Sequence, residues 1–110
     1  MPAKIKLYQT DTGDYRFDLV AENRAVMGSS GLFSTRDQAR LAIDLIRMLA
    51  KDPRQFGLYC DADGKYCFRL NSRGGEAVLE SQGYSSNSAA QEGLRLLQDI
   101  AVNAPITEVT

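Results

Sequence analysis

The chain has 110 residues, 44% of them hydrophobic and 25% charged, and its formal net charge at pH 7 is −1. This length and composition are typical of one soluble globular domain and exclude a disordered or fibrous chain. The balanced charge provides no general positive field for nucleic acid or for an anionic membrane, although a local basic patch stays open.

The first half of the chain predicts three strands. Leu7, Phe17 and Leu19 belong to short segments in which apolar and polar residues alternate, and this is the period of a strand with one buried face. A third strand is expected within residues 25–30.

A helix follows these strands. Residues 34–37, Ser-Thr-Arg-Asp, form a capping box with Ser34 as the cap. The helix should end near Lys51, because Pro53 and the residue before it disfavour helical backbone. Residues 54–56 then form a short extended piece.

The second half begins with a predicted hairpin. A three-residue loop, residues 62–64, would pair Leu58 with Phe68 and Cys60 with Tyr66, and it would place all four side chains on one face. A two-residue turn would instead bring an aspartate toward the core, so the longer loop is favoured.

The rest of the second half follows the order of the first. A third strand is expected near residues 77–82, and Ser85 is the expected cap of a second helix. That helix should end before Asn103, and residues 106–109 should again be extended.

The two halves are copies of one unit. The residues Leu7, Tyr8, Gly13, Tyr15, Phe17 and Leu19 recur 51 positions later as Leu58, Tyr59, Gly64, Tyr66, Phe68 and Leu70. Ala25, Val26 and Ser29 recur 52 positions later as Ala77, Val78 and Ser81, which predicts an inserted residue in the glycine-rich turn at 74–75. We therefore expect a single domain, 1–110, built from repeat one (4–53) and repeat two (54–110).

The second repeat contains DADGKYCFRL followed by GYSSNSAAQEGL. With these motifs the chain resembles the YegP-like family of small tandem-repeat bacterial proteins of unknown function. The resemblance is weaker in the first repeat, where residues 31–34 read Gly-Leu-Phe-Ser. It implies an α+β fold in which two tandem β-β-β-α-β units form one shared antiparallel sheet with exchanged terminal strands and both helices on one face. It implies no reaction and no catalytic residues.

The residue types give no catalytic or metal site. There is no histidine, and the two cysteines, Cys60 and Cys67, should lie on opposite sides of the hairpin, one in the core and one at the surface. A calcium loop with Gly64 at its sixth position would have Tyr59 first and Leu70 last, where carboxylates are required. We therefore expect no metal, no cofactor and no enzymatic activity.

Two surfaces are candidate sites. The first is the sheet face opposite the helices, where Tyr8, Arg16, Tyr59 and Arg69 are candidate ligand-binding residues. Such a face could stack a base or hold an extended peptide. The alternative is that these side chains only shield a solvated sheet face through cross-strand contacts.

The second candidate is a partner patch on the first helix. Its core stripe is Ala39, Ala42, Ile43, Ile46 and Ala50. Leu41, Leu45 and Met48 form another apolar stripe beside it. This stripe either packs sideways against the second helix, through Leu96 and Ala89, or recruits a partner.

We expect a cytoplasmic interaction or accessory module, because the first ten residues have no apolar signal-peptide core and no segment reaches the roughly 18 apolar residues of a membrane helix. Its expected partner is another protein or a second copy of itself, and we expect no association with a membrane. The alternative is a weak binder of single-stranded nucleic acid or peptide through the open sheet face.

Overall fold

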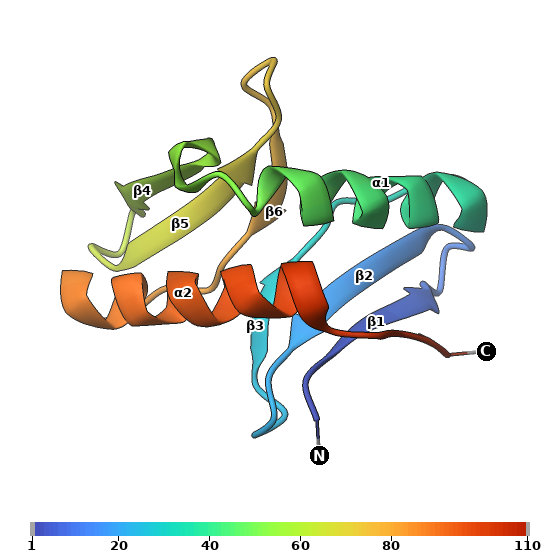
Figure 1. The fold of residues 1–110 in the computed structure, drawn as a ribbon, viewed down its shortest axis with the longest axis horizontal. Coiled ribbons are helices and arrows are strands. Elements are labelled where there is room, and N and C mark those ends of the chain that lie inside the picture. The colour runs from blue at the N-terminus through green and yellow to red at the C-terminus, as the bar shows by residue number, and fades with distance from the viewer. Residues whose placement is uncertain (1, 110) are drawn as a thin grey trace.

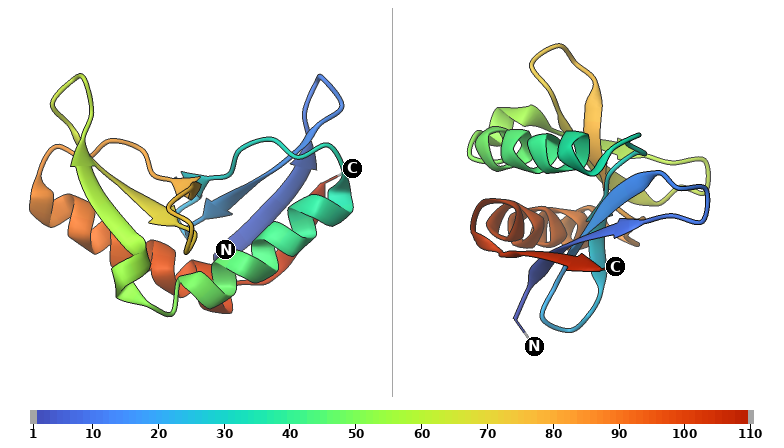
Figure 2. Two further views of the ribbon diagram at one scale, coloured as in Figure 1. Left: turned by 90° about the horizontal axis from the view of Figure 1, so that it is seen from above. Right: turned by 90° about the vertical axis from the view of Figure 1, so that its right-hand side faces the viewer.

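The computed structural model describes residues 2–109, in which seven strands form one sheet and two α-helices cover one face of it (Figures 1 and 2). In chain order the elements are β1 (Lys4–Gln9), β2 (Tyr15–Val20), β3 (Val26–Ser29), α1 (Arg36–Leu49), the 3₁₀ turn η1 (Pro53–Gln55), β4 (Phe56–Cys60), β5 (Tyr66–Asn71), β6 (Ala77–Glu80), α2 (Asn87–Asn103) and β7 (Ile106–Val109). The predicted α+β architecture of two repeated units is confirmed.

The two repeats meet in the middle of the sheet, whose strand order is β4-β5-β6-β3-β2-β1-β7. β3 and β6 pair antiparallel there, through Ser29 and Glu80. β7 crosses from the second repeat to the first and pairs in parallel with β1, with Ile106 opposite Ile5. The expected antiparallel sheet is therefore wrong at this edge, and the sheet is mixed. The direction is parallel because α2 delivers the chain to the end of the sheet at which β1 begins.

Within residues 2–109, one of the two expected exchanged strands forms. After α1, the turn η1 leads directly into β4, and no strand pairs with the outer edge of β4 in this part of the chain. The linker explains the difference. A strand parallel to β4 would have to return to the start of β4 through a connection of roughly a dozen residues, but only six residues separate Leu49 from Phe56.

The hairpin of the second repeat has the predicted register. Leu58 lies opposite Phe68 and Cys60 lies opposite Tyr66. Gly64 ends the three-residue loop with φ +77°, a left-handed conformation in which a residue with a side chain is strained. The long-loop alternative is therefore confirmed.

The repeat spacing is 51 residues throughout, so the predicted insertion at residues 74–75 is wrong. The turns between the second and third strands have the same size, since Arg24 (φ 71°) and Gly75 (φ 91°) both adopt the left-handed conformation 51 positions apart. Ser30 Oγ accepts from Phe17 N at 3.0 Å, and Ser81 Oγ accepts from Phe68 N at 2.9 Å, again 51 positions apart. The matches at 52 positions were chance identities between small residues. We call residues 51 positions apart repeat mates.

Each helix starts one residue later than predicted. Thr35 Oγ1 accepts from the backbone N–H of Gln38 at 3.1 Å, and Ser86 Oγ accepts from that of Ala89 at 3.1 Å. The hydroxyl of Ser34 instead donates to the Gln38 side chain. Thr35 and Ser86 are repeat mates, so the constant spacing extends to the caps.

The helices run antiparallel, side by side across the outside of the sheet (Figure 1), and each one closes the C-terminal end of the other. The Arg47 guanidinium of α1 donates to the carbonyls of Ala101, Val102 and Ala104 at 3.2, 3.1 and 2.7 Å. Its repeat mate Gln98 on α2 donates to the carbonyl of Ala50 at 2.6 Å. Helix ends leave carbonyls without intrahelical partners, so these bonds tie the two repeats together.

Candidate functional site

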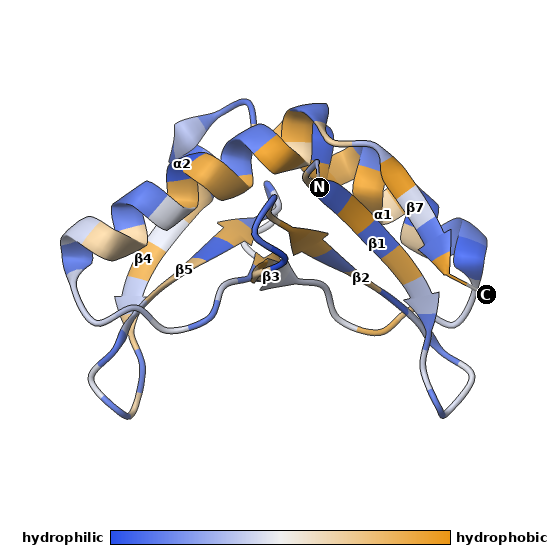
Figure 3. Cartoon of the chain, turned by 90° about the horizontal axis from the view of Figure 1, so that it is seen from below, coloured by the Kyte–Doolittle hydropathy of each residue, from blue (hydrophilic) through white to orange (hydrophobic). Residues whose placement is uncertain are grey.

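The open face of the sheet is concave. The two arms of the sheet bend away from its centre, with the helices on the outer side and the hairpin loops at the two tips (Figures 2 and 3). At the centre, between β3 and β6, lies a hollow of about 470 Å³. Its lining includes Arg16, Ser29, Glu80 and Gln82.

The four predicted ligand-binding residues do not form one site. Tyr8 and Arg16 are cross-strand neighbours on β1 and β2, whereas Tyr59 and Arg69 belong to β4 and β5 in the other arm. Four strands separate β1 from β4. At the usual strand spacing this is roughly 24 Å along the sheet. The two tyrosines therefore cannot stack on neighbouring bases.

Each arginine of this face has a carboxylate close to it. The Arg69 guanidinium lies 4.1 Å from the centre of the Tyr59 ring, and its Nε is 3.8 Å from the carboxylate of Glu80. Arg16 Nε lies 4.0 Å from the carboxylate of Asp18, is buried, and makes no hydrogen bond. Burial and the Asp18 carboxylate raise the pKa of Tyr8, so its phenol stays neutral over the physiological range. These contacts support the interpretation that the side chains shield the face.

Two carboxylates in the middle of the open face were missed in the sequence. Lys6, Asp18, Ser29, Glu80 and Arg69 form one continuous row across five strands. The two acidic residues lie near its centre, and Ser29 Oγ donates to Asp18 at 2.8 Å. The alternation that identified Tyr8 and Arg69 also places Asp18 and Glu80 on this face, so the sequence carried the signal. A phosphate backbone would meet both carboxylates.

The cysteines contribute no reactive group to this face. Cys67 is 4% exposed and lies opposite Tyr59 on the open face, whereas Cys60 is exposed and lies opposite Tyr66 on the other face. The Cys67 Sγ is 3.7 Å from the carboxylate of Asp61. Burial and that negative charge raise the pKa of the Cys67 thiol, which lowers its thiolate fraction.

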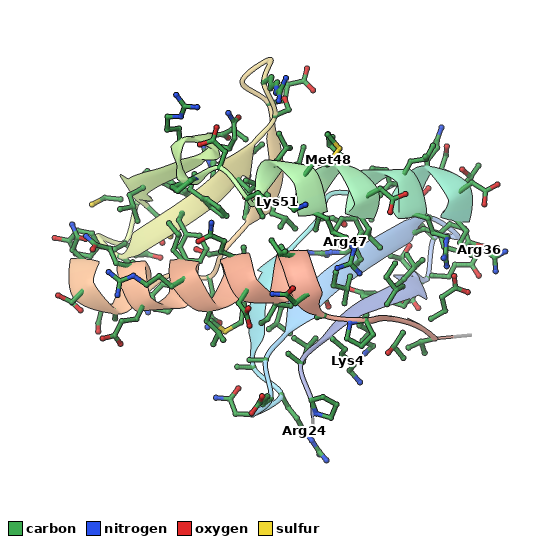
Figure 4. All side chains as sticks on the ribbon, viewed as in Figure 1. Lys4, Arg24, Arg36, Arg47, Met48 and Lys51 are labelled. Carbon is green, nitrogen blue, oxygen red and sulfur yellow. The ribbon has the colours of Figure 1, made fainter. Side chains whose placement is uncertain are left out.

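The apolar stripe on α1 is exposed. Leu41 is 68% exposed, Leu45 41% and Met48 66%. The interpretation that this stripe packs against α2 is wrong, because Arg47 occupies the side of α1 that faces α2. Figure 4 shows Met48 on the edge of α1 that points away from α2.

The equivalent face of α2 is polar at two of its three positions. The repeat mates of Leu41, Leu45 and Met48 are Glu92, Leu96 and Asp99, and all three are exposed. The fold therefore does not require an apolar stripe at these positions. We call Leu41, Leu45 and Met48 the α1 face.

Charges of both signs flank the α1 face. Asp37 lies toward its N-terminal end together with Arg36 and Arg40, and Asp44 lies beside its middle. At its C-terminal end Met48, Asp52 and Arg73 line a common hollow of about 300 Å³, beside the exposed Lys51. Neither end of the face carries charges of one sign alone.

No metal-binding or membrane-spanning feature accompanies these surfaces. Among the residues that the structure describes, no three Cys, Asp or Glu side chains are grouped as metal ligands. No helix in the same range has the length and apolarity to cross a bilayer.

Comparisons with known proteins agree with the repeat and the fold. The family described as a domain of unknown function, DUF1508, matches residues 11–55 and again residues 61–108. A UPF0339 protein of Pseudomonas aeruginosa is 27% identical over 108 residues, which cover 98% of each chain. A UPF0339 protein of Methanosarcina acetivorans is 40% identical over 52 residues, 47% of this chain but 90% of that protein. Nearly all of that relative thus corresponds to about one repeat length.

Solved structures give the same result. The solution structure of YegP, a protein of unknown function from E. coli, has a TM-score of 0.89 over 98% of this chain and 93% of that chain, at 18% identity. The solution structure of a UPF0339 protein from Shewanella oneidensis has the same TM-score at 20% identity. The predicted resemblance to YegP-like proteins is confirmed.

Proposed function

Because this chain belongs to the family described as a domain of unknown function, DUF1508, we propose its function from its own surface: it is a small protein-interaction module that docks through the α1 face. The described residues supply no catalytic constellation that would favour an enzyme. The proposal concerns Leu41, Leu45 and Met48 and the charges beside them.

One observation carries the proposal, namely the difference between the two helices. Leu41 and Met48 are more than half exposed, although the same positions of the second repeat hold Glu92 and Asp99. Exposed apolar side chains favour aggregation unless they are covered by a partner. Packing within the chain does not explain this difference between the helices, whereas a docking role of α1 does.

We infer that the first partner is a second copy of the chain. In an antiparallel pair of α1 helices related by a two-fold axis near Leu45, Leu41 of one copy would meet Met48 of the other. Asp37 would then lie near Lys51 of the second copy. A two-fold interface needs such a self-complementary patch. The α1 face is smaller than the roughly 800 Å² per partner of a standard interface, so the pair should be weak and transient.

Sedimentation equilibrium tests this function. The wild-type chain should show a concentration-dependent mass, with dimer present at protein concentrations of about 0.1–1 mM, as expected for an interface of a few kcal/mol. Leu45→Glu should remain monomeric. The matched control is Leu96→Glu, since Leu96 is the repeat mate of Leu45 and is similarly exposed, at 43%. Equal behaviour of the two variants would refute docking through α1.

A second candidate surface is the concave sheet face, for which we propose an extended peptide rather than nucleic acid. The hollow of about 470 Å³ between β3 and β6 supports it. A titration with a lysine-rich peptide and with a single-stranded oligonucleotide, read from amide chemical shifts, separates the two ligands. If neither ligand shifts the resonances of Tyr8, Arg16, Tyr59 and Arg69, this surface has no such role.

A further inference from the structure

Leu7 and Leu58 are repeat mates with different exposure. Leu7 on β1 is 2% exposed, whereas Leu58 on β4 is 46% exposed. Both residues lie opposite a buried phenylalanine, Phe17 or Phe68, with the same register. The difference arises at the outer edge of each strand, because β7 covers β1 and no strand of residues 2–109 covers β4.

The covered edge shows what such a position accepts. β7 lies parallel to β1, with Ile106 opposite Ile5 and Glu108 opposite Leu7. The backbone N–H of Ile5 donates to the carbonyl of Pro105 at 2.9 Å. The Ile106 side chain packs against the core. This edge therefore binds a strand through backbone bonds and through one apolar side chain that faces the helices.

Arginines on α1 hold the third position of that strand. Arg36 NH1 lies 3.4 Å from the Glu108 carboxylate, and Arg40 forms a second ion pair with it. Ion pairs at exposed sites contribute modestly to stability, but they select a carboxylate at this position. The occupant of the edge is thus matched to the helix above it.

At β4 the corresponding backbone groups also face outward, but the first of them is already engaged. Phe56 is the repeat mate of Ile5, and its N–H donates to the carbonyl of Pro53 in η1. An added strand would therefore begin its backbone bonds at the Phe56 carbonyl and the Leu58 N–H. Alternation along the strand then directs the N–H of Leu58 toward the open edge. Unpaired strand edges readily pair with another chain.

We propose that the outer edge of β4 is a binding site for an extended segment of a partner protein, which adds in parallel as an eighth strand of the sheet. The segment would take the place that β7 takes beside β1. This mode of recognition derives its affinity from backbone bonds and its selectivity from alternate side chains.

The side chains around the edge define the segment. A β-branched apolar residue would lie opposite Phe56, as Ile106 does opposite Ile5. Two positions later, opposite Leu58, the segment would carry a neutral residue. The repeat mates of Arg36 and Arg40 are Asn87 and Gln91, which bond to each other at 2.7 Å and offer no charge to a carboxylate.

This site is separate from the α1 face, and a second copy fits it less well. Two β4 edges related by a two-fold axis would have to pair antiparallel. In the first repeat the added strand, β7, is parallel to β1. Its apolar residue Ile106 lies opposite Ile5, near the start of β1. A partner segment can adopt that direction freely.

A titration with a designed peptide tests the proposal on the intact chain. The probe is Ala-Pro-Ile-Thr-Gln-Val, the sequence of residues 104–109 with glutamine in place of glutamate. We expect saturable shifts of the amide resonances of β4 at peptide concentrations of about 1 mM, the range of short strand additions. The unaltered sequence, with glutamate, should bind at least about threefold more weakly.

Two controls keep the outcome clear. A peptide with proline in place of threonine lacks an N–H that a parallel ladder uses, so its binding should be lost while the protein is unchanged. Leu58→Pro removes the outward N–H of β4 that the peptide would use, so this variant should not bind the peptide. Edge strands tolerate such a proline. Shifts confined to β1 and β7 would mean that the peptide displaces β7, and they would overturn the proposal. The same holds for an absence of shifts, or for β4 shifts that depend on protein concentration without peptide, which would identify a second copy as the occupant.

Discussion

The hydroxyl group of Tyr84 fills the space that a side chain on Gly93 would occupy. The repeat mates of these residues are Phe33 and Ala42. Each aromatic ring stacks on a core phenylalanine, at 6.0 Å between Phe33 and Phe17 and at 5.9 Å between Tyr84 and Phe68. The second repeat has thus exchanged one methyl group on the helix for one hydroxyl group on the ring.

This exchange predicts a coupled pair of substitutions. Gly93→Ala should destabilise the protein by about 1 kcal/mol, because overpacking against Tyr84 costs about 1–3 kcal/mol and the gain in helix propensity is about 1 kcal/mol. The double variant Tyr84→Phe with Gly93→Ala should be more stable than wild type by about 1 kcal/mol. Urea unfolding of the four chains measures the coupling. Additive effects would contradict this account.

The hydrogen bonds from Arg47 to the end of α2 predict that two substitutions of Arg47 lower the stability by unequal amounts. Arg47→Ala should lower the free energy of unfolding by about 2 kcal/mol, since a charged donor to several carbonyls is lost. Arg47→Gln should lose less than about 1 kcal/mol, because Gln98 performs the same role at the repeat mate. Thermal unfolding compares the two variants. If neither variant loses stability, the capping by Arg47 is unimportant, and if both lose about 2 kcal/mol, glutamine does not replace it.

The open edge of β4 predicts that the repeat mates Leu7 and Leu58 differ in how much stability their substitution by alanine costs. Leu7→Ala should cost about 3 kcal/mol, as for a fully buried leucine, whereas Leu58→Ala should cost less than about 1 kcal/mol. Denaturant unfolding gives both values on the same chain. A similar cost at both positions would show that Leu58 is covered in solution.

The two thiols should differ in reactivity. Cys60 is exposed and should react rapidly with a disulfide reagent near neutral pH, and Cys67 should react only as the protein opens. The raised pKa of Cys67 means that the folded state holds its proton more tightly than the unfolded state. Its contribution to stability is therefore present below the pKa of an unfolded thiol and is lost as the pH rises through the folded pKa. Equal rates for both thiols in the native protein would contradict the burial of Cys67.

Local patterns in the sequence predicted the repeated unit and its hairpin, whereas the shared sheet was expected from the resemblance to YegP-like proteins. The alternation around Leu58 and Phe68 and the left-handed glycine in the loop determine the hairpin register, and both are local properties. The parallel pairing of β7 depends on where α2 ends, which no local pattern contains. The third-strand spacing was misread because small residues such as Ala25 and Ser29 match by chance.

The candidate surfaces were only partly predictable. Periodicity placed Leu41, Leu45 and Met48 beside the core stripe, but it could not show on which side of α1 the second helix lies. The position of Arg47 determines this, and it depends on a contact with residues about 55 positions away. The vacant edge of β4 follows from comparing the two repeats in three dimensions.

The proposed function depends on docking between two copies of the chain through the α1 face. An intermolecular methyl NOE in a mixture of two differently labelled samples detects this docking. We expect contacts from the Leu41 methyl groups of one copy to the Met48 methyl group of the other, absent in Leu45→Glu and retained in Leu96→Glu. Methyl shifts of Leu41, Leu45 and Met48 that stay constant up to about 1 mM protein, without any such contact, would contradict it.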